Sequence, residues 1–193
     1  GTITVTESDI SNGSVIGPRQ SSARWTFNEG RKGVMFDVRG GNHGWIRDAE
    51  RGKGLAGGGL RFDGQSLAEV PDAGHLNGSG GLTTSIWFRL DPDVDYSNDV
   101  RWPRLLSTAP GGAFRETDGY VLSIGRGQVI GAIGNGSEAA VLVGPRITDN
   151  RWHHLLMTWD GQTVSLYLDG VRVDSGTTNA RLTGSPRLTI GGS

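Results

Sequence analysis

The chain has 193 residues, and its 19 basic and 20 acidic side chains are mixed along its length to give a net charge of −1. This length suits a single domain, and the charge pattern excludes the basic stripe of a nucleic-acid-binding protein and the polybasic segment of a membrane-surface protein. Cysteine is absent, which excludes disulfides and thiolate chemistry, and no apolar run approaches the roughly 20 residues of a membrane-spanning helix, so no membrane insertion is expected.

Short apolar runs separated by glycine predict a protein built from β-strands. Glycine supplies 33 residues, far above its average share of about 7%, and no stretch has a helical period. Strands of this length between glycine turns are typical of an all-β fold, a two-sheet antiparallel β-sandwich. In chain order, strands are expected at residues 2–6, 23–27, 59–63, 67–70, 82–90, 104–107, 119–124, 128–133, 139–143, 152–159, 162–168, 171–175 and 187–190. Residues 28–44 are expected to form long loops around one short apolar piece at 34–36.

Residues 151–175 carry the strongest structural signal. Two Asp-Gly pairs, at 160–161 and 169–170, lie between runs of β-branched and aromatic residues. Asp-Gly supplies the positive φ angles of a two-residue type I′ turn, which matches the twist of paired strands. The stretch therefore predicts a three-stranded antiparallel meander.

This meander resembles the laminin-G-like domain of the concanavalin A-like lectin/glucanase superfamily. The resemblance covers residues 24–193, and residues 1–23 are expected to form an N-terminal strand and an extended wrap of the same single domain, residues 1–193. The resemblance rests on an ordered series of motifs: WTFNEG at 25–30, DVRGGNHG at 37–44, LRFDG at 60–64, the strand at 82–88, WHH at 152–154, TWDG at 158–161, LYLDG at 166–170 and LTIGGS at 188–193.

The resemblance implies a jelly-roll sandwich that acts as a non-catalytic module, binding glycans or proteins and often a calcium ion. It also implies an extracellular, cell-surface or periplasmic location. The family continues beyond the final Gly-Gly-Ser with another strand, so either residues 2–6 fill that place, or the sequence ends early, or another polypeptide completes the sheet. Because the chain begins at Gly1 rather than Met, we expect a processed product or an excised piece.

The sequence lacks the catalytic motifs of enzymes on this fold. Members that cleave β-glucans resemble one another in a Glu-x-Asp-x-x-Glu strand, whose carboxylates act as nucleophile and acid. None of the glutamates here has a second glutamate within five residues. Related lyases use a Gln-x-His strand, and the nearest match, residues 128–130, has no histidine. We therefore expect no enzyme, with a glycan-active hydrolase or lyase as the less favoured alternative.

His153 and His154 are neighbours on an expected strand. Adjacent strand residues point to opposite faces, so the two imidazoles cannot form a two-ligand metal site together. The preferred interpretation is that one is buried and hydrogen-bonded while the other faces outward.

Two loops offer oxygen atoms of the kind that calcium binds. Residues 37–44 provide the Asp37 carboxylate, the Asn42 amide and several glycine carbonyls, and they match the family's loop. The alternative is a glycine-shaped turn in which Asp37 caps backbone N–H groups. Residues 91–99 begin Asp-x-Asp-x-Asp, but Tyr96 and Trp102 stand where an EF-hand requires glycine and glutamate, so a solvated acidic loop is expected.

Aromatic side chains in the expected loops are candidates for stacking against a sugar ring. Pyranose C–H groups pack on aromatic faces while polar neighbours bind the hydroxyls, although a structural role is the alternative for each. Trp25, Trp152 and Trp159 lie on expected strands and are assigned to the core. The candidates are Trp45, Tyr96, Trp102 and Phe114.

Together these features favour a non-catalytic recognition module that binds a glycan or polysaccharide through its loop aromatics. Asp37 and Asn42 are the candidate ligands of a structural Ca²⁺ ion. A protein-interaction, adhesion or spacer domain within a larger surface or secreted protein is the alternative, because a fold does not determine a function.

Overall fold

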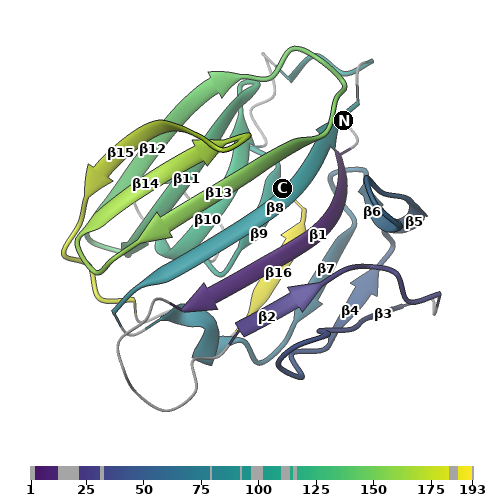
Figure 1. The fold of residues 1–193 in the computed structure, drawn as a ribbon, viewed down its shortest axis with the longest axis horizontal. Coiled ribbons are helices and arrows are strands. Elements are labelled where there is room, and N and C mark those ends of the chain that lie inside the picture. Colours follow the sequence, from purple (N-terminus) through teal and green to yellow (C-terminus); the bar gives the residue numbers. More distant parts are fainter. Residues whose placement is uncertain are drawn as a thin grey trace.

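The computed structural model describes residues 3–12, 22–30, 33–78, 80–91, 93–96, 102–109, 114, 117–182 and 187–192. Within them the chain forms two eight-stranded antiparallel sheets, here sheets A and B, which stack face to face (Figure 1). The predicted all-β sandwich is confirmed, and it is consistent with a jelly roll. The 3₁₀ turn η1 (Gly74–Asn77) lies between β7 and β8, and the described residues contain no helix of the length and apolarity needed to cross a bilayer.

Sheet A lies in front in Figure 1, with β1 in its interior. The strand β2 (Ser22–Trp25) pairs with the second half of β1. The main path runs through β15 (Val171–Thr177), β14 (Thr163–Leu168), β13 (His153–Trp159), β8 (Leu82–Leu90), β1 (Ile3–Asn12), β6 (Gly58–Phe62) and β5 (Glu50–Lys53).

Sheet B lies behind sheet A in Figure 1. Its path runs through β12 (Ala139–Arg146), β11 (Gln128–Asn135), β10 (Asp118–Gly125), β9 (Arg104–Ser107), β16 (Leu188–Gly191), β7 (Leu67–Val70), β4 (Gly44–Arg47) and β3 (Val34–Met35).

The first strand is longer than the sequence predicts. Residues 7–12 are polar and were expected to belong to a wrap, which is wrong, because β1 continues to Asn12. Its main chain is paired on both sides: β8 runs along its whole length, β6 pairs with residues 3–5 and β2 with residues 8–11. Backbone pairing on two sides stabilises this polar segment as a strand without apolar alternation. The N-terminal strand thus fills an interior position of sheet A.

The meander of β13, β14 and β15 is confirmed, but its two turns differ. Asp169 and Gly170 have φ angles of 51° and 82°, which is the type I′ pattern predicted for a two-residue turn. At the other turn only Gly161 has a positive φ, and the Asp160 carboxylate accepts hydrogen bonds from the backbone N–H groups of Gln162 and Thr163. The prediction of a second type I′ turn is therefore wrong, since the aspartate shapes that turn with its side chain.

The core lies between the sheets, where alternate residues of each strand point inward. On β8, Leu82, Thr84, Ile86, Phe88 and Leu90 are buried, while the residues that alternate with them are more exposed. Trp25 is fully buried and Trp159 nearly so, which confirms their assignment to the core.

Candidate functional site

A row of side chains in register crosses the outer face of sheet B. On each strand of the sheet the neighbouring residues point into the core, so alternation directs this row outward. The two strands at one end, β3 and β4, belong to a glycine-rich segment that was expected to form long loops, so that expectation is wrong for residues 34–35 and 44–47. The row comprises Val34, Trp45, Glu69, Thr189, Ser107, Val121, Ala132 and Val141, of which Glu69, Ser107, Val121 and Ala132 are buried.

Trp45 is the most accessible aromatic side chain of this face. It lies on β4 rather than in a loop, and 57% of its surface is exposed. The preceding residue explains how β4 comes so close to β7: a Cβ atom on Gly44 would lie 2.4 Å from the backbone oxygen of Glu69. Gly44 therefore allows the close strand pairing that places Trp45 opposite Glu69.

Glu69 lies between two arginines beside Trp45. Its side chain is only 6% exposed, and its Oε1 and Oε2 atoms lie 3.3 Å from Arg47 Nη2 and 3.4 Å from Arg187 Nη1. Both arginine side chains are 59% exposed. A buried carboxylate needs such partners, because an unpaired charge taken out of water is costly. None of Glu69, Arg47 and Arg187 was predicted from the sequence as a site residue. The one local signal was the spacing of Trp45 and Arg47, which puts both side chains on the same face of β4.

The aromatic candidates Trp102 and Phe114 pack against each other, with ring centroids 5.3 Å apart in an edge-to-face arrangement. Both are half-buried. The Trp102 ring packs where a Cβ on Gly125 would be, and Arg126 lies over it with Cζ 5.9 Å from the ring centroid. Gly125 follows the inward-facing Ile124 on β10, so this cluster lies on the outer face of sheet B too.

Tyr96 has a different setting, because only 6% of it is exposed. Its hydroxyl oxygen accepts a hydrogen bond from the Asp91 N–H at 3.4 Å. It forms part of the wall of a polar hollow of about 400 Å³, lined also by Asp91, Arg146, Asp149 and Asn150.

Asp37 and Asn42 form a tightly hydrogen-bonded turn. The Asp37 carboxylate accepts bonds from the backbone N–H groups of Arg24, Arg39, Gly40 and Asn42 and from the Asn42 amide, at 2.7–3.0 Å. Five donors occupy the roughly four lone-pair sites of a carboxylate, so the arrangement does not fit a calcium ligand. Burial raises the pKa of Asp37, but these hydrogen bonds outweigh it and the pKa is lowered.

Calcium at Asp37 and Asn42 thus stays a prediction, and the geometry favours the alternative of a glycine-shaped turn. In the part of the chain that the structure describes, no group of three or more histidine, aspartate or glutamate side chains is arranged to hold a metal ion.

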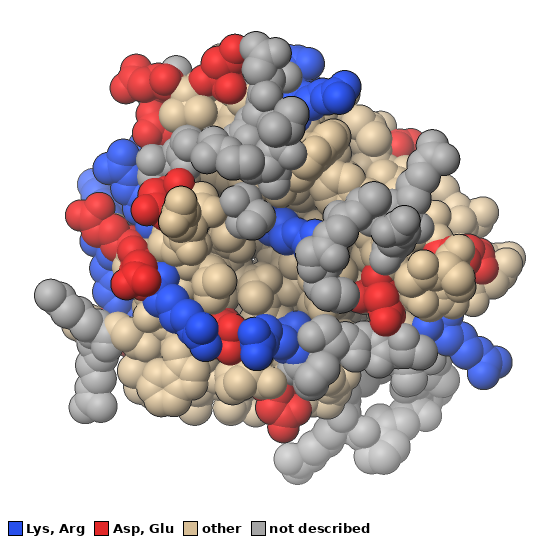
Figure 2. Space-filling view, turned by 180° about the vertical axis from the view of Figure 1, so that it is seen from behind, with Lys and Arg blue, Asp and Glu red and all other residues tan. Residues whose placement is uncertain are grey.

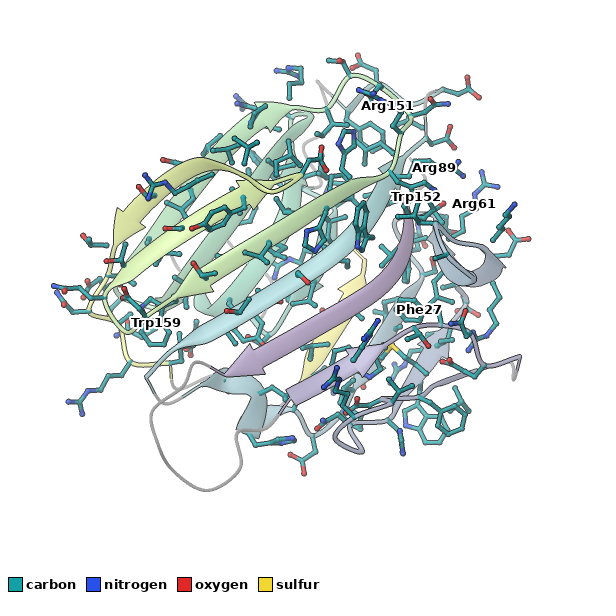
Figure 3. The ribbon with its side chains drawn as sticks, in the orientation of Figure 1. Phe27, Arg61, Arg89, Arg151, Trp152 and Trp159 are labelled. Carbon is teal, nitrogen blue, oxygen red and sulfur yellow. The ribbon has the colours of Figure 1, made fainter. Side chains whose placement is uncertain are left out.

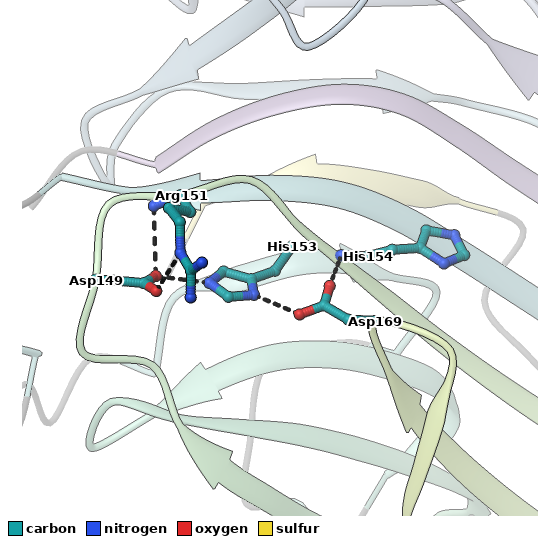
Figure 4. Close-up of polar contacts among 5 residues, drawn as sticks. All are labelled: Asp149, Arg151, His153, His154 and Asp169. Carbon is teal, nitrogen blue, oxygen red and sulfur yellow. Dashed lines mark hydrogen bonds and ion pairs between the residues drawn. The ribbon is translucent and has the colours of Figure 1, made fainter.

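His153 is buried between two aspartates, whereas His154 is half-buried on the other face, as expected from strand alternation. The His153 Nε2 and Nδ1 atoms lie 2.7 Å from Asp149 Oδ1 and 2.8 Å from Asp169 Oδ2 (Figure 4). Only the doubly protonated imidazolium donates to both carboxylates. The network joins the segment before β13 to the turn between β14 and β15.

Stability should depend on pH through this network. Burial lowers the pKa of His153, but the hydrogen bonds to Asp149 and Asp169 outweigh it and raise the pKa above 6.5. Its contribution is therefore complete below about pH 6.5 and lost as pH rises through the raised value. The pKa of Asp149 is lowered to about 2, chiefly by hydrogen bonds from His153 and Arg151, so its contribution is lost as pH falls from about 4 towards 2.

The measurement is the difference in free energy of unfolding between the wild type and His153→Gln, from urea denaturation between pH 3 and pH 9. The difference should be largest between about pH 4 and pH 6.5 and should shrink at higher pH. A difference that does not change with pH contradicts a charged His153.

The outer face of sheet A carries a second aromatic group. Trp152 is half-buried outside the core, so its assignment to the core is wrong; Arg89 lies 5.3 Å from its ring centroid (Figure 3). Trp152 directly precedes the first residue of β13. Beside it, the rings of Trp87 and His154 are 4.9 Å apart.

Comparison with known proteins adds a family and a set of similar folds. A laminin G model of the concanavalin A-like lectin/glucanases superfamily matches residues 62–193. No curated protein sequence matches the chain.

Three solved structures illustrate the similarity of fold. The binding domain of botulinum neurotoxin DC in complex with SialylT has a TM-score of 0.63 at 12% identity, over 86% of this chain and 42% of that one. Domain 4 of AbnA, a GH43 extracellular arabinanase from Geobacillus stearothermophilus in complex with arabinotriose, has a TM-score of 0.58 at 18% identity, over 81% and 77%. The botulinum neurotoxin type G receptor binding domain has a TM-score of 0.52 at 14% identity, over 86% of this chain and 41% of that one. The chain thus spans about two fifths of either neurotoxin chain.

Proposed function

The chain belongs to the laminin G-like part of the concanavalin A-like lectin/glucanases superfamily, and from that premise we propose that it is a non-catalytic module that binds carbohydrate on the outer face of sheet B. The observation that carries the proposal is Trp45, which exposes more than half of its surface beside polar side chains on a rigid strand. An indole face of this kind packs against sugar C–H groups while its polar neighbours bind hydroxyls.

Similar folds support this class of ligand. Domain 4 of AbnA is described in complex with arabinotriose, and the botulinum neurotoxin DC domain is a binding domain. Identities of 12–18% show a shared fold only, so the argument for this chain rests on its own side chains. We infer a location outside the cytoplasm, where polysaccharides are found.

The absence of catalysis is part of the proposal. Within the eight described residues of the outer row, Glu69 is the single carboxylate, and two arginines hold it. Glycosidases that use two carboxylates need them about 5–10 Å apart across the scissile bond. Release of oligosaccharides from a polysaccharide by the pure protein would show a glycan-active enzyme instead.

The alternative is a protein-interaction or adhesion domain. The half-exposed Trp87 and Trp152 on the outer face of sheet A favour it, because aromatic side chains with neighbouring arginines are enriched in protein interfaces.

Binding to a panel of soluble polysaccharides, measured by affinity gel electrophoresis, tests the proposal. We expect saturable binding to at least one polymer, weakened about tenfold by Trp45→Ala and by Trp102→Ala, because each removes roughly 1.5 kcal/mol of stacking and buried area.

The matched control is Trp87→Ala, which removes a half-exposed tryptophan from the other sheet and should leave the affinity unchanged. Equal losses in all three variants, or no binding by the wild type to any glycan together with capture of a protein partner, would favour the alternative.

A further inference from the structure

Two arginines flank the exposed tryptophan of the proposed site. Arg47 follows Trp45 by two residues on β4, roughly 7 Å along the strand and on the same face. Arg187 reaches Glu69 from the segment before β16. Figure 2 shows basic side chains gathered near the middle of this face, with acidic atoms beside them.

The charges of this group do not cancel. One buried carboxylate, Glu69, lies between two guanidinium groups whose side chains are 59% exposed. Glu69 contacts Nη2 of Arg47 and Nη1 of Arg187, and among these three residues two guanidinium groups outnumber one carboxylate. Glu69 therefore fixes the two side chains in position and leaves the group with a net positive charge. Fixed guanidinium forks suit carboxylates and sulfates, which accept paired hydrogen bonds.

A second tryptophan on the face has an arginine packed on its ring, whereas Arg47 shares only the strand and the face of Trp45. Arg126 lies over the ring of Trp102, and Trp102 precedes β9. Because β9 is three strands from β4 in sheet B, the two tryptophan–arginine pairs are separated by roughly 14 Å or more. An extended chain of sugars could contact both pairs, with a stacking surface and a cation at each.

The attraction of an acidic ligand to these arginines would be local, because the whole chain has a net charge of −1. A protein of this charge does not collect polyanions through its overall field. Selection of an acidic ligand therefore requires the arrangement on this face.

We propose that the ligand is an acidic polysaccharide, whose carboxylate or sulfate groups bind Arg47 and Arg187 while a sugar ring stacks on Trp45. This rests on the proposed carbohydrate-binding function and names the class of sugar.

Paired polymers test the proposal by isothermal titration calorimetry: polygalacturonate against its fully methyl-esterified form for carboxylates, and dextran sulfate against dextran for sulfates. In at least one pair the acidic member should bind at least about tenfold more tightly. Arg187→Gln should weaken that binding about tenfold, as expected when one hydrogen bond to a charged group is lost. The single substitution leaves Arg47 on Glu69, so the fold should be retained, which thermal melting checks.

The matched control is Arg172→Gln, which makes the same change in net charge at an exposed position of β15 in sheet A. It should leave the affinity unchanged. Equal losses in the two variants would overturn the proposal, as would equal binding of the acidic and neutral members of both pairs, and in those cases carbohydrate binding itself would stand. If no polysaccharide of any charge binds, the proposed function fails as well.

Discussion

Replacing Trp25 by alanine is expected to lower the free energy of unfolding by about 4 kcal/mol, the cost of deleting a buried aromatic side chain. Trp25 is fully buried between the sheets, and its Nε1 donates a hydrogen bond to the Asn42 carbonyl at 2.8 Å. It thus joins β2 to the loop that leads into β4. Urea denaturation followed by circular dichroism measures the loss.

Two substitutions make this prediction specific. Trp25→Phe keeps most of the packing and loses the hydrogen bond, so an intermediate loss is expected. Trp45→Ala removes the same number of atoms from a side chain that is 57% exposed, and should cost less than about 1 kcal/mol. Similar losses for Trp25→Ala and Trp45→Ala would contradict the assignment of one to the core and the other to the surface.

The substitution Asp37→Ala is expected to cause the second large loss in the free energy of unfolding. Removing the carboxylate leaves five N–H groups without their acceptor. An unsatisfied buried donor costs about 1–3 kcal/mol, and water can reach some of the five, so we expect a total loss of about 3 kcal/mol. Differential scanning calorimetry of wild type and variant checks it.

The same experiment separates a hydrogen-bonded turn from a calcium site. Calcium or a chelator should leave the melting temperature of the wild type unchanged, because a ligand that binds only the folded state would raise it. Asp63→Ala is the control, since its carboxylate serves an exposed turn through Gln65 and Ser66, and its loss should be smaller. Calcium-dependent melting in the wild type that Asp37→Ala abolishes would restore the metal site.

The strands that follow simple patterns could be predicted. Residues 82–90 and 153–159 alternate cleanly because one face of each packs in the core. The strands β4 and β5 could not be predicted, since each has only four residues and lies in a glycine-rich segment, and they pair with β7 and β6. The second half of β1 could not be predicted either. Its polar residues form a strand through main-chain hydrogen bonds to β2 on one side and β8 on the other.

The candidate site could be predicted only in part. Trp45 was a candidate because its segment was expected to be a loop, although it lies on the strand β4. Glu69 and Arg187 are far apart in the sequence and meet only because β7 lies between β4 and β16 in sheet B. No local pattern marks such a pair, so a lone glutamate on a short apolar strand gave no sign of its arginine partners.

The indole N–H signals of the six tryptophans in a ¹H–¹⁵N spectrum, recorded while an oligogalacturonate is added, test the location of binding most directly. The outer face of sheet B carries Trp45 and Trp102, and the outer face of sheet A carries Trp87 and Trp152. We expect the signals of Trp45 and Trp102 to shift and those of Trp87 and Trp152 to stay in place. Shifts of Trp87 and Trp152, with Trp45 and Trp102 unmoved, would contradict the account.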